Sequence, residues 1–369
     1  NKMLTRGDGR DTFTFSLKLK SGGDKLEYDF VLNSEVNDPA KLDRAGNYKM
    51  YSLLDANYFK LNEIIPYGTR FRGPVGDIIK TILTGVLGDD IVNEEEFEPG
   101  DNVVDIFPEH ILPPSSFRYS DLIKYLLQIY YFQDEDIVTR AFLKFDRLDK
   151  KYSLIPLIME GFAANDLVDK IKPNKNNPPS EATVNIYETQ LPQTNMTTPM
   201  LDYSNEFFVN YLATGYDPIL GEHVMIEKRI KDIKEKWTKS FVDVFKSVGG
   251  KPKPFLPLNN HKKENMFRTI STPFSVRKTA NITEAEMAAN LVFYNLSLTI
   301  GVLGSTDRTS GKFIDIYRTD SPTESDKKLL GRWLVTTCRH KFLGDTYHNT
   351  IQCVKTYVGP GTEIKDDID

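Results

Sequence analysis

The sequence predicts an α+β protein, and three observations lead to that prediction. Apolar and polar residues alternate strictly over residues 12–20 and 26–33, which is typical of antiparallel strands. From residue 74 the apolar residues recur at helical spacing, and alternation returns in the last hundred residues. The chain has 369 residues, more than the ~250–300 at which one hydrophobic core stops growing, so we expect at least two domains.

Composition excludes several classes of protein. Hydrophobic residues make up 40% of the chain and aromatic residues 11%, so the chain can bury a core and is neither disordered nor collagen-like. A formal net charge of −5 argues against a chain that binds polyanions over its whole surface. No apolar run approaches the ~18 residues of a membrane-spanning helix, so we expect no membrane insertion.

Residues 1–70 are expected to form a first small antiparallel β domain. A Gly22-Gly23 turn, where glycine tolerates positive φ, would set the register of the first hairpin and place Phe15 opposite Phe30. Further strands are expected at residues 48–54 and 58–65. The alternate residues that share the apolar face of the hairpin are Phe13, Phe15, Leu17, Leu19, Leu26, Tyr28, Phe30 and Leu32.

Residues 71–182 are expected to form an α+β unit. Apolar residues spaced along one face predict helices at residues 74–87 and 120–130. Alternation predicts a hairpin made of residues 137–145 and 152–157.

Two segments carry a strong local charge. Residues 89–110 hold nine Asp or Glu and no Lys or Arg, which we interpret as a solvated loop. Residues 228–263 hold eleven Lys or Arg against three Asp or Glu, and a helical pattern begins at Glu227, so residues 227–270 are expected to be a basic helical insertion. We interpret it first as a surface helix with a Lys/Pro loop and second as a protein-docking face. A nucleic-acid site comes third, because aromatic residues do not interleave the lysines.

A second β domain is expected from residues 183–226 and 271–358, after a polar linker at residues 172–181. The capping box Thr283-Glu284-Ala285-Glu286 should begin a short helix. Residues 359–369 are expected to be a tail. Strands are predicted at residues 182–187, 206–212, 296–300, 313–317, 332–342 and 347–358.

The last two of these strands are expected to pair across a turn at residues 343–346. This register places Phe342 opposite Tyr347, His340 opposite Asn349, and Cys338 opposite Ile351. His340 then lies on the core-like face, where we interpret it as a hydrogen-bonded structural residue rather than a catalytic base.

The two cysteines are expected to be free thiols. In this register Cys353 lies opposite Thr336, so Cys338 and Cys353 are diagonal neighbours, ~7–8 Å apart at Cα and beyond ordinary disulfide reach. Two cysteines also cannot build a disulfide framework or a cysteine-rich zinc site.

No residue stands out as catalytic, cofactor-binding or metal-ligating. The five histidines are scattered, and no phosphate-binding glycine loop or dinucleotide fingerprint occurs. We therefore expect a protein that is not an enzyme and that needs no cofactor.

The order of elements resembles that of the baseplate hub proteins of contractile-tailed, T-even-like phages and of the N-terminal part of type VI secretion spike proteins. The similarity begins with Tyr67-Gly68-Thr69 before the helix start at residues 76–79, and continues at residues 117–127, which lead into the strand at 137–145. It is strongest in the C-terminal ladder, where Trp333, Val335, His340 and Tyr347 occupy matching places. That ladder comprises residues 284–287, 296–301, 311–316, 332–340 and 347–351.

The resemblance implies a fold and a function. Such hubs contain two β-barrel-like tube domains with mixed α/β domains packed outside. Three copies form a ring that joins the sixfold tail tube to the threefold central spike and surrounds part of the DNA channel. It implies as partners two further copies of this chain, a central spike protein, tail tube initiator proteins, and the tape measure and baseplate wedge proteins. DNA would only pass through the channel, and the location would be the virion baseplate, assembled in the host cytoplasm.

Two alternatives remain. The first is a tail-associated cell-wall hydrolase that works through a carboxylate, for which the only dense acidic cluster is at residues 94–98. The second is a receptor- or sugar-binding tail protein, whose hallmark would be clustered exposed aromatic residues on a loop.

Overall fold

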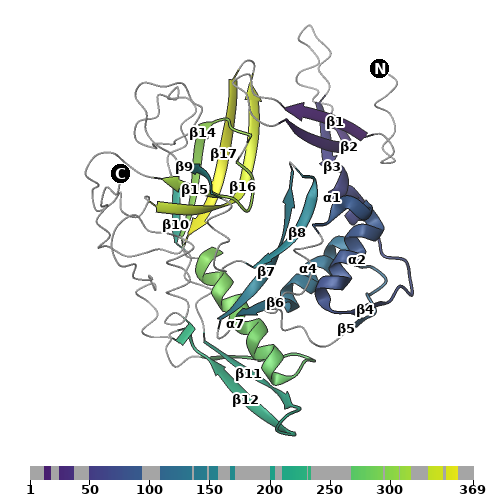
Figure 1. Cartoon of the computed structure of the whole chain (residues 1–369), viewed down its shortest axis with the longest axis vertical. Coiled ribbons are helices and arrows are strands. Elements are labelled where there is room, and N and C mark those ends of the chain that lie inside the picture. Colours follow the sequence, from purple (N-terminus) through teal and green to yellow (C-terminus); the bar gives the residue numbers. More distant parts are fainter. Residues whose placement is uncertain are drawn as a thin grey trace, which may run out of the picture. The chain divides into compact units, whose positions relative to one another are not determined.

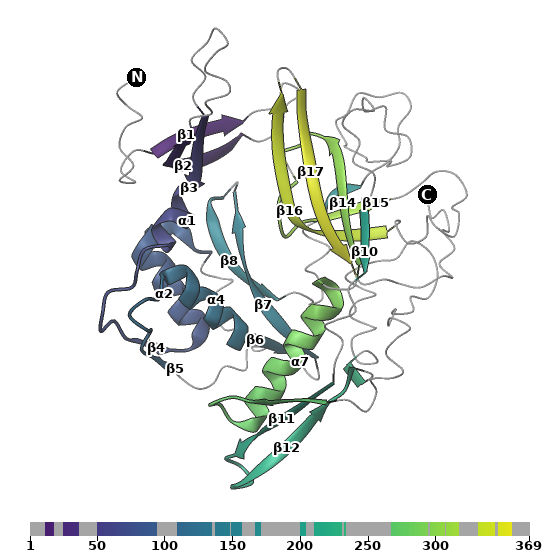
Figure 2. The same ribbon diagram turned by 180° about the vertical axis from the view of Figure 1, so that it is seen from behind.

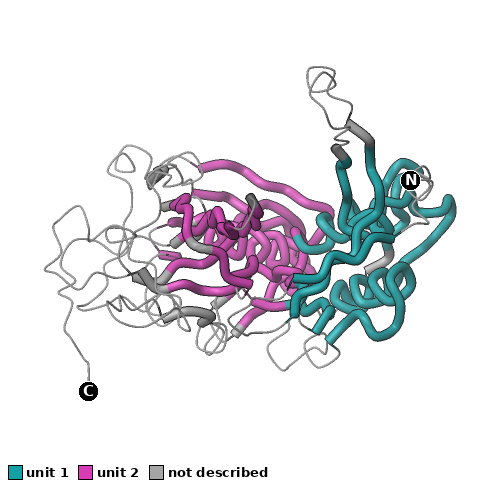
Figure 3. Tube along the Cα trace, turned by 90° about the horizontal axis from the view of Figure 1, so that it is seen from above, with its two compact units in different colours: residues 1–100, 105–127, 145–154 teal, residues 101–104, 128–144, 155–369 magenta. Residues whose placement is uncertain are grey.

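The computed structural model confirms a mixed α+β chain rich in sheets (Figure 1). The chain forms two compact units, coloured separately in Figure 3. Unit 1 comprises residues 1–100, 105–127 and 145–154, and unit 2 comprises residues 101–104, 128–144 and 155–369. The finer division into five segments stays a prediction. The structure describes residues 12–17, 25–36, 50–93, 109–134, 137–147, 149–156, 167–170, 200–203, 210–230, 232–233, 267–293, 296–306, 308–316, 331–343 and 346–355.

Unit 1 contains an antiparallel sheet with the order β1-β2-β3. Its strands are β1 (Thr12–Leu17), β2 (Leu26–Val36) and β3 (Met50–Asp55). The predicted register is wrong by two residues, because Phe15 pairs with Tyr28 and Phe13 with Phe30. A shift by two keeps every side chain on its face, so alternation alone could not reveal it.

The face of this sheet that carries Phe15 is partly open. Phe15 lies in the middle of the predicted apolar face, where burial was expected, but it is 47% exposed. Its ring lies 6.5 Å from that of Tyr28, and the Tyr28 ring stacks on Phe30 at 6.0 Å. The guanidinium of Arg147 lies over the Tyr28 ring, 4.5 Å from its centre, so this aromatic row is partly covered.

Helices supply the core of unit 1. The expected helices are confirmed as α2 (Val75–Leu87) and α4 (Tyr119–Ile129). Their buried residues include Ile78, Ile79, Ile82, Leu83, Leu122 and Leu126. Short elements complete the unit: η2 (Asp89–Ile91) and a pair of strands, β4 (Phe71–Gly73) and β5 (Glu109–Ile111).

The strand predicted at residues 58–65 is wrong. Residues there form helix α1 (Ala56–Leu61), which begins because the carboxylate of Asp55 accepts hydrogen bonds from the backbone N–H groups of Asn57 and Tyr58. An N-cap of this kind satisfies donors that the first turn leaves unpaired.

The hairpin predicted at residues 137–157 is confirmed. Strands β6 (Tyr131–Asp134), β7 (Ile137–Asp146) and β8 (Lys151–Pro156) form a three-stranded sheet in that order. Strand β6, which the sequence did not predict, pairs antiparallel with β7.

The largest sheet of unit 2 has the strand order β10-β14-β17-β16-β15-β9 and curls like part of a barrel (Figures 1 and 2). The predicted pairs Phe342–Tyr347, His340–Asn349 and Cys338–Ile351 are confirmed. Its strands are β9 (Leu167–Lys170), β10 (Met200–Tyr203), β14 (Leu296–Leu303), β15 (Phe313–Ile316), β16 (Gly331–Leu343) and β17 (Thr346–Lys355).

A β-bulge corrects the far end of the β16–β17 pair. The register shifts between Val335 and Thr337, so Cys353 lies opposite Val335 and not opposite Thr336. One extra residue in a strand moves the residues beyond it to the other face. As a result Trp333 and Val335, both fully buried, share the inner face with Cys353.

A separate three-stranded sheet with the order β12-β11-β13 lies beside helix α7 (Val276–Phe293). Strands β11 (Asn210–Asp217) and β12 (Glu222–Lys228) form a hairpin, and β13 (Phe267–Ser271) pairs parallel with β11. The expected helix from Glu227 therefore begins later, because β12 runs to Lys228. Ile230 and Ile233 are buried, and residues 234–266 lie outside the described residues.

The predicted helix start at Thr283 is wrong, because α7 begins at Val276. The Ser275 hydroxyl accepts from the N–H of Lys278 and so caps the helix. Thr283 lies in the middle, where its hydroxyl donates to the carbonyl of Thr279 at 2.7 Å. This local bond satisfies the side chain within the helix, so the Ser/Thr-x-x-Glu pattern does not mark an end here.

Candidate functional site around helix α7

Helix α7 is buried on most of its circumference. On one side Val276 and Ala280 pack against Ala213 of β11, with Val224 and Ile226 of β12 closing the cluster. Small side chains let the elements approach closely: a Cβ added at Gly215 would lie 3.4 Å from the backbone of Val276.

The other side of α7 packs against β6 and β7. There Ala285 and Ile282 contact Tyr131 and Val138. Apolar contacts on both sides explain why α7 lacks the one-sided apolar stripe of a surface helix.

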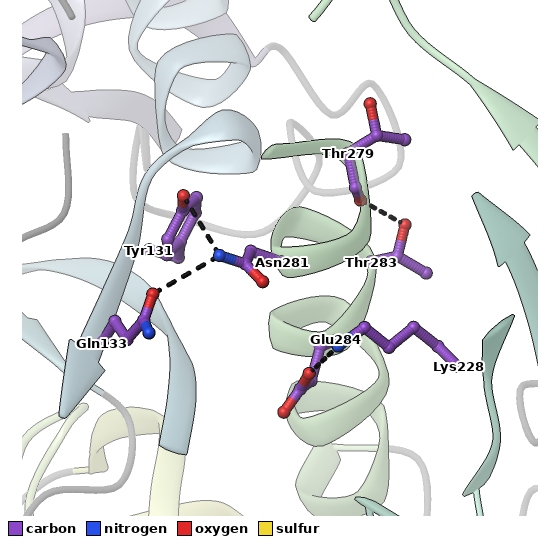
Figure 4. Close-up of polar contacts among 7 residues, drawn as sticks. All are labelled: Tyr131, Gln133, Lys228, Thr279, Asn281, Thr283 and Glu284. Carbon is purple, nitrogen blue, oxygen red and sulfur yellow. Dashed lines mark hydrogen bonds and ion pairs between the residues drawn. The ribbon is translucent and has the colours of Figure 1, made fainter. Parts of the chain in front are cut away.

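Polar side chains add hydrogen bonds and an ion pair to this apolar packing (Figure 4). The Asn281 amide nitrogen donates to Gln133 Oε1 at 3.4 Å and to Tyr131 Oη at 3.5 Å. Lys228 Nζ, at the end of β12, forms an ion pair with the buried carboxylate of Glu284 (Figure 4). A buried carboxylate without such a partner would be costly, so this pair fixes the position of β12 on the helix.

A second ion pair joins the hairpin tip to α7. Asp217, at the end of β11, accepts from the backbone N–H groups of Ile219 and Leu220, while Arg277 Nε donates to its other oxygen at 2.8 Å. Burial by itself raises the pKa of Asp217, but the hydrogen bonds from Ile219 and Arg277 outweigh it, so the pKa lies below its ordinary value. The turn is therefore held by an ionised carboxylate.

A shallow hollow of about 290 Å³ opens between these two ion pairs. The residues that line it are Gln133 of β6, Ile226 and Lys228 of β12, and Arg277, Ala280 and Asn281 of α7. Its volume lies at the lower limit of the 300–1,000 Å³ typical of small-molecule sites, so it is large enough for one or two side chains.

Exposed apolar side chains gather on the same hairpin. Met225 is 69% exposed, and Tyr216, Ile219 and Leu220 are also exposed. Single exposed apolar residues are ordinary, but four within ten residues on one hairpin mark a surface that can bind another protein.

The residues singled out in the sequence lie elsewhere, in the large sheet. His340 is hydrogen-bonded as predicted: its Nδ1 lies 3.0 Å from Asn349 Nδ2 and 2.7 Å from Tyr347 Oη. Asn349 Oδ1 in turn accepts from Ser305 N at 2.6 Å and from the buried Arg308. This network ties the segment after β14 to β16 and β17.

Both cysteines are free thiols in the same sheet. Burial raises the pKa of Cys338 to about 11, and it raises that of the fully buried Cys353 further. Neither thiol is therefore set up as a nucleophile.

The ion pairs around α7 hold β11, β12 and the helix together. In the described part of the chain, no group of three or more His, Cys, Asp or Glu side chains is placed to hold a metal ion. None of the described helices combines the length and apolar character needed to cross a bilayer. The acidic cluster at residues 94–98, the expected site of a hydrolase, lies outside the described residues.

The sequence did not reveal the site around α7. Lys228 was counted with the basic segment, and Glu284 with a capping box. The two residues are 56 positions apart in the chain, and they pair only because β12 packs against α7. A single sequence carries no signal for that packing.

Comparison with known proteins gives a likeness of fold. No protein-family model matches the sequence, and no curated protein matches it. The solved structure of a tail protein from Neisseria meningitidis MC58 is 10% identical over 90% of this chain and 81% of its own, with a TM-score of 0.50. At this identity the likeness shows a shared fold.

Two further solved structures are similar at lower TM-scores. The 43 kDa tail protein of prophage MuSo2 from Shewanella oneidensis is 8% identical over 93% of this chain and 89% of its own, with a TM-score of 0.47. The prophage tail protein gp18 from Listeria monocytogenes EGD-e is 10% identical over 94% and 84%, with a TM-score of 0.37.

Proposed function

We propose that this chain is a structural component of a phage tail. The observation that carries the proposal is the shared fold with the Neisseria tail protein, which extends over 90% of this chain. The α7 region supports it, because the described polar groups there tie elements together and leave an apolar hairpin exposed.

Within the tail, we propose the role of baseplate hub. Three copies would form a ring between the sixfold tube and the threefold spike, as the order of elements in the sequence suggests. The partners would be a central spike protein, tail tube initiators, and the tape measure and wedge proteins, with DNA passing through the ring. The open face around Phe15 supports assembly, because exposed sheet faces and edges are usually covered by a neighbour.

Two measurements test this proposal. Light scattering of the purified full chain should report three times the 42.2 kDa chain mass, and negative-stain images should show threefold rings. A monomer at all concentrations would contradict the hub role. The hydrolase alternative predicts that the protein releases soluble fragments from purified peptidoglycan, whereas the hub predicts no release above that of heat-treated protein.

A further inference from the structure

We propose that the outer edge of β12 and the adjoining hollow bind an extended, acidic segment of another polypeptide. The segment would add a strand to the β12-β11-β13 sheet and place carboxylate side chains in the hollow.

The first step of the argument is the sheet edge. Strand β12 is the outer strand of its sheet, and within the described ranges no strand is hydrogen-bonded to its other side. Such an edge presents a row of backbone donors and acceptors, which an extended peptide can pair with.

The second step is the geometry of an added strand. Val224, Ile226 and Lys228 alternate on the face of β12 that packs toward α7, while Met225 points to the opposite face and is 69% exposed. A new strand about 4.8 Å away continues both faces. Its inward side chains would therefore lie next to Ile226 and Lys228, where the hollow is, and its outward side chains next to Met225.

The third step is charge. In both ion pairs beside the hollow the cation is more exposed than the anion. The side chain of Arg277 is 53% exposed against 1% for Asp217, and that of Lys228 is 20% exposed against 3% for Glu284. The surface of the hollow is thus cationic although the four residues sum to zero charge. An incoming carboxylate would meet Lys228 and Arg277 and be kept from the two buried anions.

The probe for this site is a fluorescein-labelled peptide, Thr-Val-Glu-Val-Glu-Val-Thr, whose glutamates share one face. Fluorescence anisotropy should show saturable binding to the full chain. The matched peptide with glutamine in place of glutamate should bind at least tenfold more weakly, because it lacks the charge-assisted hydrogen bonds. Equal affinity for the two peptides would overturn the proposal. So would the absence of binding at peptide concentrations up to about 1 mM.

Three variants locate the binding. Arg277→Gln keeps a donor for Asp217 but removes the cation, and should weaken binding about tenfold, while Arg277→Lys should restore most of it. Arg229→Gln is the control, because Arg229 is an exposed cation paired with Glu227 on the same strand end and does not line the hollow. Equal loss in both glutamine variants would show a general charge effect and overturn the site.

The occupant is tested separately. If Arg277→Gln, but not Arg229→Gln, dissociated an oligomer of the chain alone in sedimentation, the edge would be covered by a second copy, and the proposed foreign segment would be wrong. The peptide comparison uses the unaltered chain, so it decides the question even if a variant fails to fold. Failure of this site would leave the proposed tail role untouched, since the ring and peptidoglycan measurements do not involve it.

Discussion

Tyr152 shows how burial of a single side chain makes stability depend on pH. Its ring packs against Phe145 at 4.6 Å. Burial, and then the negative charge of Asp55, raise the pKa of Tyr152 to about 12, although a hydrogen bond with Asn57 lowers it in part. The folded chain therefore keeps this proton at a pH where an unfolded tyrosine, with an ordinary pKa of ~10, loses it.

The direction of this pH dependence follows from the linkage between proton binding and folding. The stability that Tyr152 contributes is complete below pH ~10 and is lost as the pH rises toward 12, at up to about 1.4 kcal/mol per pH unit. Tyr152→Phe should remove this part of the alkaline loss, at the cost of about 1 kcal/mol at pH 7 for the hydrogen bond with Asn57. Urea unfolding between pH 7 and 11 measures both effects. Tyr67→Phe is the control, because Tyr67 is 95% exposed and its surroundings barely change on folding; an identical alkaline slope for wild type and Tyr152→Phe would contradict the assignment.

The cysteines give a second prediction at this scale. Burial raises the pKa of both thiols, so a thiol reagent at pH 8 should modify them slowly in the native chain. After unfolding in guanidinium, the reagent should modify both thiols at once. Mass spectrometry after alkylation should find Cys338 labelled before Cys353, since only Cys353 is fully buried. A bonded pair under non-reducing conditions would show that the register of β16 and β17 is wrong.

At the scale of elements, two glycines are expected to respond to the same substitution in opposite ways. Gly304 follows β14, and a Cβ there would overlap the ring of Tyr347. That ring cannot move easily, because it stacks on Phe342 at 4.5 Å and its hydroxyl donates to the carbonyl of Ser305. Gly304→Ala should destabilise the fold by about 1–3 kcal/mol, as overpacking does.

Gly85→Ala is the matched comparison. Gly85 lies inside helix α2, and an added Cβ would meet nothing within 4 Å. Alanine is the better helix former, so this variant should gain about 0.5–1 kcal/mol. Thermal unfolding of both variants measures the difference; a stabilised Gly304→Ala would mean that Tyr347 lies elsewhere.

What the sequence could predict differs from element to element. Helices α2 and α4 were found because their apolar residues recur on one face, and the turn of β16 and β17 because its two ends carry matching alternation. The register of β1 could not be seen, because a shift by two residues leaves the alternation unchanged. The bulge at Thr336 could not be seen either, because Trp333, Leu334 and Val335 before it are all apolar and do not show which residues share a face. The Asp55 cap of α1 was missed, because residues 58–65 were predicted to form a strand.

The site around α7 could not be predicted from the sequence for a different reason. The helix carries no one-sided pattern, since sheets pack on two of its sides, and its buried charge has its partner on a distant strand. Local propensity and spacing contain neither fact. Only the packing of separate elements brings Lys228 and Arg277 beside the hollow.

At the scale of the whole molecule, charge reversal in the basic segment should spare the lysine that the fold itself needs. Lys228 belongs to β12 and pairs with Glu284, so reversing its charge would leave a buried carboxylate unpaired. The other lysines considered for charge reversal, Lys231, Lys234 and Lys239, lie outside the described residues. Replacing these three by Glu should impair attachment to an acidic tail partner and leave a trimer intact. Sedimentation of the variant and its incorporation into baseplates measure the two effects; loss of the trimer would place this segment in the ring contact.

The last prediction concerns the ring itself. We predict that the sheet of β1, β2 and β3 in one subunit lies beside the C-terminal sheet of the next, in a homotrimer. The sheet has only three strands, β1 is an outer strand, and Phe15 on it is 47% exposed. This apolar face is only partly covered within the chain, and a closed ring would cover it further in every copy.

Phe15→Asp tests this arrangement. Because Phe15 is half exposed within the chain, the substitution should cost the isolated chain much less than the ~3–5 kcal/mol of a core aromatic, yet it should place a carboxylate in the subunit contact and abolish the trimer. Tyr67→Asp is the matched control, an exposed aromatic on the turn at residues 66–69 that should leave the trimer intact. Light scattering reports assembly and urea unfolding reports the fold of each variant. A Phe15→Asp chain that is fully folded and still trimeric would show that this face is not the contact, and a structure in which chains make no contact would refute the ring.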